Sequence, residues 1–183
     1  MKKSVLFAGI AILMIILIGG ILVYKNQNRK DFISPPSNIT MKISSVFANE
    51  GVIPDKYGCK GSDVNPPLKI EEIPEDAKTL VLIVDDPDAP SGDWVHWVVF
   101  NIPISSSKLE IKEDSIPGEE GMNDFKKTNY GGPCPPSGTH RYYFKAYALD
   151  SSLGLDFATK KDVEREMNGH VLAKAELMGK YSR

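Results

Sequence analysis

The chain has 183 residues, a length that suits one domain of ordinary size and a short extra segment. Its 22 basic and 24 acidic residues give a formal net charge of −2. This balance argues against a nucleic-acid partner, because proteins that bind nucleic acids usually present a basic face. Hydrophobic residues make up 42% of the sequence, enough for a packed core, so disorder is expected only near the ends.

The extra segment is the N-terminus, where two lysines precede an uncharged apolar run over residues 4–24. A run of this length can cross the hydrocarbon core of a bilayer, which takes about 20 residues. Bulky residues follow the small pair Gly19 and Gly20, which disfavours signal-peptide cleavage, and no cysteine lies nearby to carry a lipid. We therefore expect residues 1–24 to be a retained membrane anchor. A cleaved signal that releases a secreted protein and a buried core helix are the alternatives.

Residues 25–38 form the predicted tether between the anchor and a domain over residues 39–183. The tether is polar, and Pro35 and Pro36 favour an extended spacer. Basic residues flank both ends of the apolar run, so the positive-inside rule hardly discriminates between orientations. An N-terminal anchor before one compact domain most often exports that domain. We therefore expect a single-pass membrane protein with an extracytoplasmic domain.

The domain is predicted to be mainly β. Residues 41–47 alternate between apolar and polar side chains, and residues 80–84 form a continuous β-branched run typical of a central strand. Residues 94–102 and 140–149 indicate two longer strands. Proline and glycine punctuate the gaps, as in sandwiches and barrels.

Helix is predicted near the end of the chain. Thr159 and Asp162 have the spacing of an N-cap and its acidic partner. An apolar stripe follows at helical spacing, and Asn168–Gly169 can divide it into two short helices that pack on the sheet. His170 is then a packing or surface residue of this helix. The stripe consists of Val163, Met167, Val171, Leu172, Ala175 and Met178.

Two histidines are expected on apolar strand surfaces, where an imidazole needs a partner. Strict alternation places His96 on one face with Trp94, Val98 and Phe100, and it places His140 on one face with Tyr142. A lone strand histidine is more often a satisfied core residue than a ligand-binding one. The functional interpretation therefore depends on what lies beside these rings.

An acidic loop offers that neighbour. Asp86 and Asp88 follow a buried strand in a loop stiffened by Pro87 and Pro90. A carboxylate there can orient one imidazole nitrogen and leave the other for a ligand. Taken alone, Asp-Pro pairs make ordinary turns, and Gly131–Gly132–Pro133 is ordinary loop. Their combination favours a small anion-accepting pocket.

Several motifs together resemble the phosphatidylethanolamine-binding protein family, and above all its bacterial and archaeal branch, the Raf-kinase-inhibitor-like proteins. The resemblance spans about residues 41–183. Its motifs are DDPDAP at 85–90, WVHWVVFNIP at 94–103, YGGPCPP at 130–136, HRY at 140–142, NPPL at 65–68 and GHVLA at 169–173.

The resemblance implies a β-sandwich-like fold with a central antiparallel sheet, small peripheral helices and a pocket for phosphate, phosphoryl head groups or carboxylates. It also allows a cis bond between Ala89 and Pro90. The short loop at 91–93 departs from the longer insertion of eukaryotic members, which argues against kinase inhibition by their route. By motif, the ligand-binding residues would be Asp86, His96, Gly132, His140 and Tyr142, and the pocket-shaping residues Asp88, Pro90 and Pro133.

Cys59 and Cys134 are the only cysteines. Free thiols, a disulfide in an exported domain and a metal site are all compatible with the sequence, although the ligand spacing matches no closed zinc pattern. Neither a cofactor nor a bound metal is expected.

The sequence thus favours a membrane-tethered, non-catalytic protein whose partner is a small anion or a phospholipid head group. Protonated histidines would strengthen the hydrogen bonds to an anion, so affinity should rise as the pH falls toward about 6. An inhibitor that presents surface loops to a protease or kinase is the main alternative. A serine hydrolase using Ser137, His140 and Asp86 is disfavoured, because no G-x-S-x-G elbow is present.

Overall fold

The computed structural model describes residues 40–183. The predicted anchor (1–24) and tether (25–38) lie outside the described residues and stay predictions. Within residues 40–183, no helix is long and apolar enough to cross a membrane.

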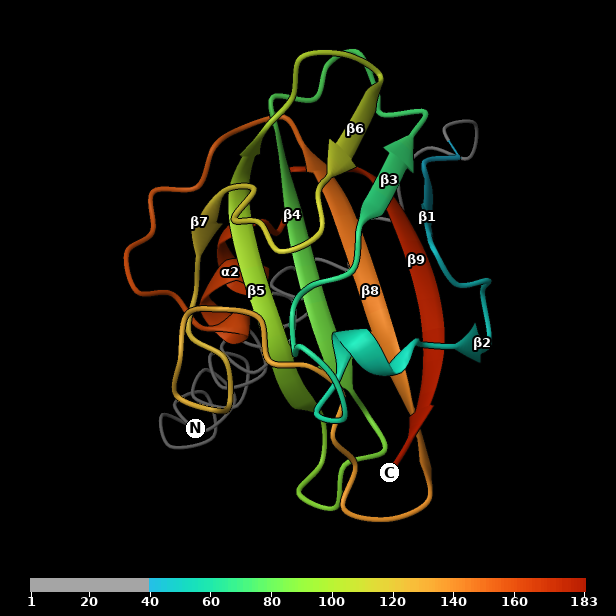
Figure 1. Ribbon diagram of the computed structural model, residues 1–183. Helices are drawn as coiled ribbons and strands as arrows, with labels where there is room; N and C mark the ends of the chain where they lie inside the picture. The colour runs from blue at the N-terminus through green and yellow to red at the C-terminus, as the bar shows by residue number, and fades with distance from the viewer. Residues whose placement is uncertain (1–39) are drawn as a thin grey trace, which may run out of the picture. The chain divides into compact units, whose positions relative to one another are not determined.

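Two sheets make up most of the domain, which confirms the mainly β prediction (Figure 1). A six-stranded sheet has the order β2-β9-β8-β4-β5-β7, antiparallel except for the β2–β9 pair. A three-stranded antiparallel sheet has the order β1-β3-β6. The strands of the large sheet are β2 (Gly51–Val52), β4 (Thr79–Asp86), β5 (Trp94–Pro103), β7 (Glu119–Glu120), β8 (Thr139–Leu149) and β9 (Val171–Ser182). Those of the small sheet are β1 (Lys42–Ser45), β3 (Leu68–Glu71) and β6 (Lys108–Ile111).

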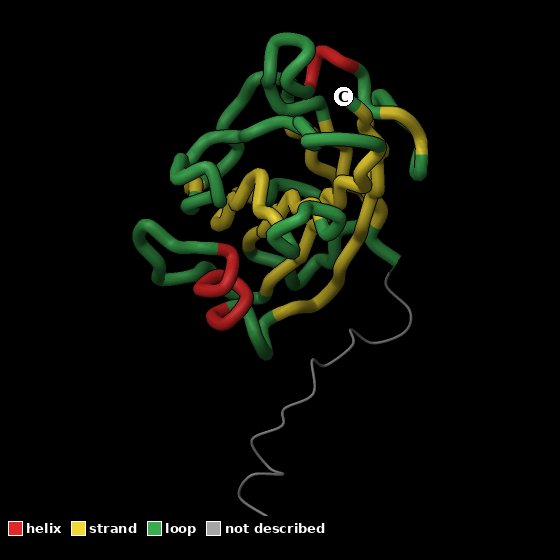
Figure 2. Tube along the Cα trace, turned by 90° about the horizontal axis from the view of Figure 1, so that it is seen from below, coloured by secondary structure: helices red, strands yellow, loops and turns green. Residues whose placement is uncertain are grey.

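Strand β4 is buried on both faces and separates two hydrophobic clusters. Leu80, Leu82 and Val84 pack in the cluster shared with the small sheet, whereas Val81 and Ile83 pack on the side of helix α2 (Lys160–Glu166). This division follows from the two-residue period of a strand. Figure 2 shows α2 and the 3-10 helix η1 (Asp55–Tyr57) on opposite sides of the strands. The continuous apolar run of β4 is therefore explained by a sheet covered on both faces.

The long C-terminal helix prediction is wrong beyond residue 166. Helix α2 has the predicted capping box of Thr159 and Asp162, but it ends before Gly169, which adopts a φ of +87°. Residues 171–182 form β9, which pairs with β8 along its length. The apolar residues there fit a two-residue period as well as a helical one. The buried residues Ala173, Leu177 and Tyr181 are an even number of positions apart, so they share one face of the strand. Pairing with a long neighbouring strand decides between the two periods.

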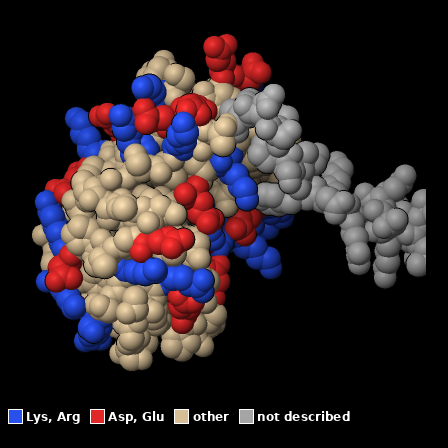
Figure 3. Space-filling view, turned by 90° about the vertical axis from the view of Figure 1, so that its right-hand side faces the viewer, with Lys and Arg blue, Asp and Glu red and all other residues tan. Residues whose placement is uncertain are grey.

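Surface charge is mixed on the face drawn in Figure 3, where acidic and basic side chains lie interspersed. This face therefore lacks the single-sign patch that a nucleic-acid partner would require.

Candidate ligand-binding site

Asp86, at the end of β4, holds His140 in place. The residue is only 3% exposed, and both carboxylate oxygens are used. Oδ1 accepts a 2.8 Å hydrogen bond from the backbone N–H of Asp88, and Oδ2 lies 2.7 Å from Nδ1 of His140. The carboxylate therefore selects the ring form with a proton on Nδ1, which leaves Nε2 without a partner from Asp86.

A β-bulge positions His96. In the β4–β5 ladder, Val84 pairs with Trp97 and Asp85 pairs with Val95, so His96 is the extra residue. A bulge of this kind turns consecutive side chains to one face and can re-aim a side chain. His96 accordingly shares a face with Trp94, as predicted. The prediction that it also shares a face with Val98 and Phe100 is wrong, because both belong to the cluster beside α2.

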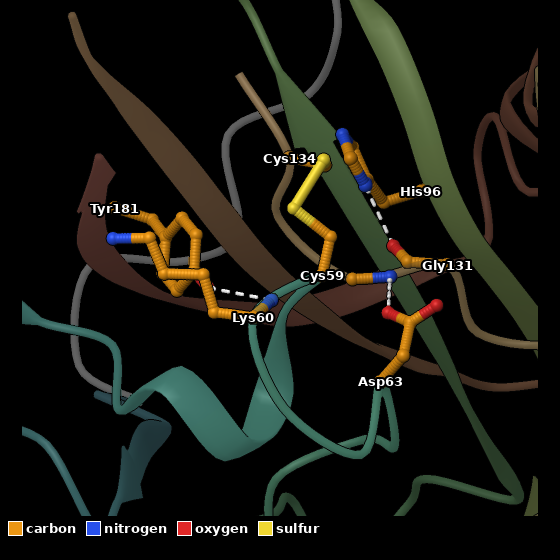
Figure 4. The surroundings of a disulfide bond; sticks show 8 residues. Cys59, Lys60, Asp63, His96, Gly131, Cys134 and Tyr181 are labelled. Atoms are coloured by element: carbon orange, nitrogen blue, oxygen red, sulfur yellow. Dashed lines mark hydrogen bonds between the residues drawn. A yellow bond between two sulfur atoms is a disulfide. The ribbon is translucent and has the colours of Figure 1, made fainter. Parts of the chain in front are cut away.

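The His96 ring is nearly buried, with 3% exposure, and its Nδ1 lies 2.6 Å from the carbonyl oxygen of Gly131. A carbonyl only accepts hydrogen bonds, so Nδ1 carries the proton and donates. Figure 4 shows the second ring nitrogen on the side away from Gly131. Burial lowers the pKa of His96, against the raising effects of the Gly131 carbonyl and the nearby Asp86 charge. The ring is therefore held neutral, with a lone pair on Nε2.

Tyr142 has a buried hydroxyl without a partner. The residue is 0% exposed, and within residues 40–183 its hydroxyl has no partner in standard hydrogen-bond geometry, although Asp86 and the backbone of Cys134 lie close enough to influence its pKa. Its ring meets that of His96 edge-on, with centroids 5.1 Å apart. Burial raises the pKa of Tyr142, and the charge of Asp86 raises it further, so the hydroxyl keeps its proton. An unpaired buried donor costs free energy unless something occupies it, so this group calls for an external acceptor.

A cavity of about 250 Å³ brings these groups together. Asp86, His96 and Tyr142 line it, and Pro90 forms part of its wall as predicted. No lysine or arginine belongs to the lining in the described part of the chain. The remaining lining residues are small, aromatic or proline, apart from one disulfide-bonded cysteine: Ala89, Ser91, Trp94, Phe125, Cys134, Pro135 and Pro136.

Two predicted site residues lie behind the cavity rather than on it. His140 is 8% exposed and does not line the cavity, although it is bonded to Asp86, which does. The N–H of Gly132 donates to Oδ1 of Asp63 at 2.7 Å and so is not free for a ligand. A Cβ on Gly132 would clash with the carbonyl oxygen of Tyr57, so glycine permits a close approach of two loops.

The predicted pocket-shaping residues act mainly by fixing loops. Asp88 binds Arg141 in a fork, with oxygen–nitrogen distances of 2.6 and 2.8 Å. These hydrogen bonds lower the pKa of Asp88 to about 2. The carbonyl of Pro133 accepts a 3.0 Å hydrogen bond from Cys59. The described residues contain no cis peptide bond, so Ala89–Pro90 is trans and the cis alternative is wrong.

The two cysteines form a disulfide, which is one of the three alternatives that the sequence left open. Cys59 and Cys134 are bonded, with their Cα atoms 5.4 Å apart (Figure 4). Because Cys134 lines the cavity, the bond ties its wall to the loop after η1. The backbone N–H of Lys60 in that loop donates to the Tyr181 hydroxyl at 3.3 Å, which links the same loop to β9.

The hydrolase arrangement does not assemble. Ser137 is exposed, does not line the cavity and makes no side-chain hydrogen bond within the described residues.

His170 lies in the turn between α2 and β9, not on a helix, with Nδ1 2.7 Å from Asp150. Residues 40–183 contain no cluster of three side chains suited to a metal ion.

Sequence reasoning missed the aromatic wall of the cavity. Phe125 comes from the loop between β7 and β8, is 39% exposed, and contacts Trp94 and His96 edge-on. Its only signal in the sequence is a single aromatic residue within the polar stretch Asn123–Lys127. Nothing in that stretch indicates which strand end it covers.

Comparison with known proteins gives a family match over most of the chain. Residues 43–182 match the profile of the family described as phosphatidylethanolamine-binding protein. A UPF0098 protein of Pyrococcus abyssi is 49% identical over 156 residues, covering 78% of this chain and 85% of the relative. A UPF0098 protein of Methanothermobacter thermautotrophicus is 48% identical over 146 residues, covering 75% and 95%.

Two crystal structures share the fold. A putative phosphatidylethanolamine-binding protein homologue from Chlamydia trachomatis is 42% identical, with a TM-score of 0.75 over 80% of this chain and 99% of its own. YbcL from E. coli, described as a member of the mammalian family, is 28% identical, with a TM-score of 0.70 over 78% and 98%. With a profile match over residues 43–182 and relatives of nearly one-half identity, the chain belongs to the phosphatidylethanolamine-binding protein family.

Proposed function

We propose that this protein binds a small anion, a phosphate or the phosphoryl group of a head group, in the cavity beside Asp86, His96 and Tyr142. The observation that carries the proposal is the buried hydroxyl of Tyr142, a residue that lines the cavity; this hydroxyl has no partner in standard hydrogen-bond geometry within residues 40–183. Its proton is available to an anionic oxygen. A volume of about 250 Å³ suits a head group better than a whole lipid.

Binding in this cavity should take up a proton. No lysine or arginine of the described residues lines it, and His96 is held neutral by burial. The proton that balances an anion must therefore come with the ligand. The affinity for a phosphate monoester should then rise as the pH falls toward about 6, where the monoester takes up its second proton.

The same arrangement supports binding rather than catalysis. Neutral His96 and the Asp86–His140 pair hold fixed orientations, but no hydroxyl or thiol among the described residues lies within hydrogen-bond reach of a ring as an activated nucleophile. Cys134 lines the cavity only as part of the disulfide.

Titration calorimetry of the full-length chain with phosphoethanolamine at pH 6 tests the proposal. We expect saturable binding that Tyr142→Phe weakens at least fivefold, because a single donor is removed from the cavity. Tyr143→Phe is the matched control, since Tyr143 contacts Arg141 on the other side of the strand. Its affinity should stay within twofold of wild type. Absence of binding by the wild-type chain would contradict the proposal.

We further propose that the apolar run over residues 4–24 anchors the chain, with the domain on the extracytoplasmic side. Its length and lack of charge support this, because they match a bilayer core. The chain should stay in the membrane fraction through alkaline carbonate washing. Protease added to intact cells or spheroplasts should degrade the domain. Release by carbonate would contradict the anchor, and protection from protease would contradict the orientation.

A further inference from the structure

We infer that the Cys59–Cys134 disulfide is a redox switch for the cavity, which a dithiol can open in the folded protein and an oxidant can close again. Because the switch would control anion binding, it depends on the proposed function. Three observations support it. The bond is exposed, other contacts hold its two segments together without it, and part of the cavity wall depends on it.

The disulfide lies at the surface, where a reductant can reach it. Cys59 and Cys134 are both exposed residues, and Cys134 also lines the cavity. The bond joins the loop after η1 to the segment that precedes β8 (Figure 4). Exposed disulfides are more readily reduced than buried ones, and they include those that serve regulation.

Hydrogen bonds hold the two segments together independently of the sulfur atoms. The N–H of Gly132 donates to Asp63 at 2.7 Å, and the Tyr130 hydroxyl donates to the carbonyl of Tyr57 at 3.0 Å. The backbone N–H of Cys59 makes a third bond to the same segment. Reduction breaks none of the three, so the two cysteine Cα atoms, 5.4 Å apart, should stay within the range that a disulfide spans. The bond can therefore open and close again without unfolding of the domain.

The wall segment (residues 134–136), in contrast, depends on the disulfide. All three of its residues line the cavity. Two of them are prolines, which have no N–H to donate, and residues 134–138 make no hydrogen bond in standard geometry with another residue of 40–183. With the disulfide open, the wall segment should move more freely. Ordering it around a ligand then costs more entropy, so the affinity should fall.

Opening the bond consumes one dithiol. A thiolate of the dithiol bonds to one sulfur of the disulfide, and the other cysteine leaves as a thiolate that takes up a proton. The second thiol of the reductant then attacks the mixed disulfide and releases the first cysteine, which also becomes a thiol. The protein has gained two electrons and two protons, and the dithiol has become an intramolecular disulfide.

Dithiothreitol, added to the full-length chain at pH 8 without denaturant, tests the switch. Mass spectrometry of an alkylated sample counts the thiols, and circular dichroism reports the fold. We expect two thiols and an unchanged β spectrum. Calorimetry at pH 6 should then show an affinity for phosphoethanolamine at least fivefold below that of the oxidised chain. Treatment of the reduced chain with oxidised glutathione should restore the affinity.

The double substitution of Cys59 and Cys134 by serine is the control. This variant should have the affinity of the reduced wild type, and dithiothreitol should not change it. A reciprocal measurement uses the wild type alone. Saturating phosphoethanolamine should raise the ratio of reduced to oxidised dithiothreitol at half reduction by the same factor by which reduction lowers the affinity.

The outcomes separate the switch from the proposed function. Reduction that requires denaturant, or equal affinity of the two redox forms, would overturn the switch and leave anion binding in place. If neither redox form binds phosphoethanolamine at any pH between 5.5 and 8, the proposed function is wrong and the switch with it.

Discussion

The end of β4 carries two consecutive aspartates that point to opposite faces of the sheet and have different partners. Oδ2 of Asp85, fully buried, accepts from Lys145 at 2.7 Å and from Lys160 at 2.6 Å. Asp86, nearly as buried, is bonded to His140 and to a backbone N–H instead. An ammonium group offers only N–H donors, whereas a neutral imidazole held at one nitrogen has a second nitrogen that can accept from another molecule. Asp85 and Asp86 therefore differ in their partners and not in their own chemistry. Lysine partners give Asp85 a structural role, whereas the histidine partner connects Asp86 to the candidate site.

The two faces are nevertheless connected. Lys160 also pairs with Asp93, which fixes the loop that contributes Ser91 to the cavity wall. Burial would lower the pKa of Lys160, but hydrogen bonds to Asp85 and Asp93 raise it above its ordinary value. Lys160 therefore stays charged at every pH of interest. The ion-pair cluster Asp85–Lys145–Lys160–Asp93 supports the cavity from the opposite face of the sheet.

The strongest test of the comparison is Asp85→Asn. It leaves two buried or half-buried ammonium groups without their shared carboxylate, which should lower the free energy of unfolding by about 3–5 kcal/mol. Urea denaturation measures the loss. Glu164→Gln is the control, because its exposed carboxylate lies 3.9 Å from Lys160 and should contribute less than about 0.5 kcal/mol. Equal effects of the two substitutions would show that the buried carboxylate contributes no more to stability than the exposed one.

On the cavity side, loss of the disulfide should have the next largest effect. The double substitution of Cys59 and Cys134 by serine opens a loop closed across 75 residues and should destabilise the domain by about 2–4 kcal/mol. Because Cys134 lines the cavity, the substitutions should also lower the affinity for phosphoethanolamine. The Asp85 cluster lies on the other face of the sheet. Denaturation and calorimetry together check this. Unchanged affinity would show that the wall does not depend on the bond.

Asp86→Asn removes the negative charge of Asp86 and leaves the size of the side chain nearly unchanged. The amide oxygen can still accept from Nδ1 of His140, but the amide lacks the charge that strengthens this hydrogen bond and holds the ring in place. We expect affinity for phosphoethanolamine at pH 6 to fall at least tenfold, with a smaller loss of stability than for Asp85→Asn. Calorimetry and urea denaturation on the same preparation give both values. The reverse order of effects would assign Asp86 to structure alone.

The smallest expected effect comes from Asp88→Asn, which weakens the fork with Arg141. The partly exposed pair should contribute about 1 kcal/mol at neutral pH. The folded pKa of about 2 lies below the ordinary value, so this contribution is present above about pH 4 and disappears as the pH falls through 2. Unfolding free energies of wild type and variant should therefore converge in acid. A constant difference down to pH 2 would contradict this origin.

Motif and strand parity predicted which side chains would lie together, and the prediction failed where the backbone departs from regular alternation. Parity correctly joined His140 to Tyr142 and His96 to Trp94. The bulge at His96 places its side chain on the face opposite to Val98 and Phe100, and no residue in the local sequence predicts that bulge. The β9 segment carries both strand and helix periods, so only its partner β8 decides between them.

Contacts between loops that are far apart along the chain could not be predicted from the sequence either. The Cys59–Cys134 pairing depends on how the loop after η1 meets the segment at 131–136. The same contact explains why Gly132, predicted to bind a ligand, is bonded to Asp63 instead. Phe125 reaches the cavity only because its loop folds over the end of β5.

A crystal structure of the protein with phosphoethanolamine, grown at pH 6, tests the central claim most directly. The account predicts phosphoryl oxygens within about 3.2 Å of both the Tyr142 hydroxyl and Nε2 of His96. Phosphoethanolamine bound elsewhere, with Tyr142 still lacking a partner, would contradict it.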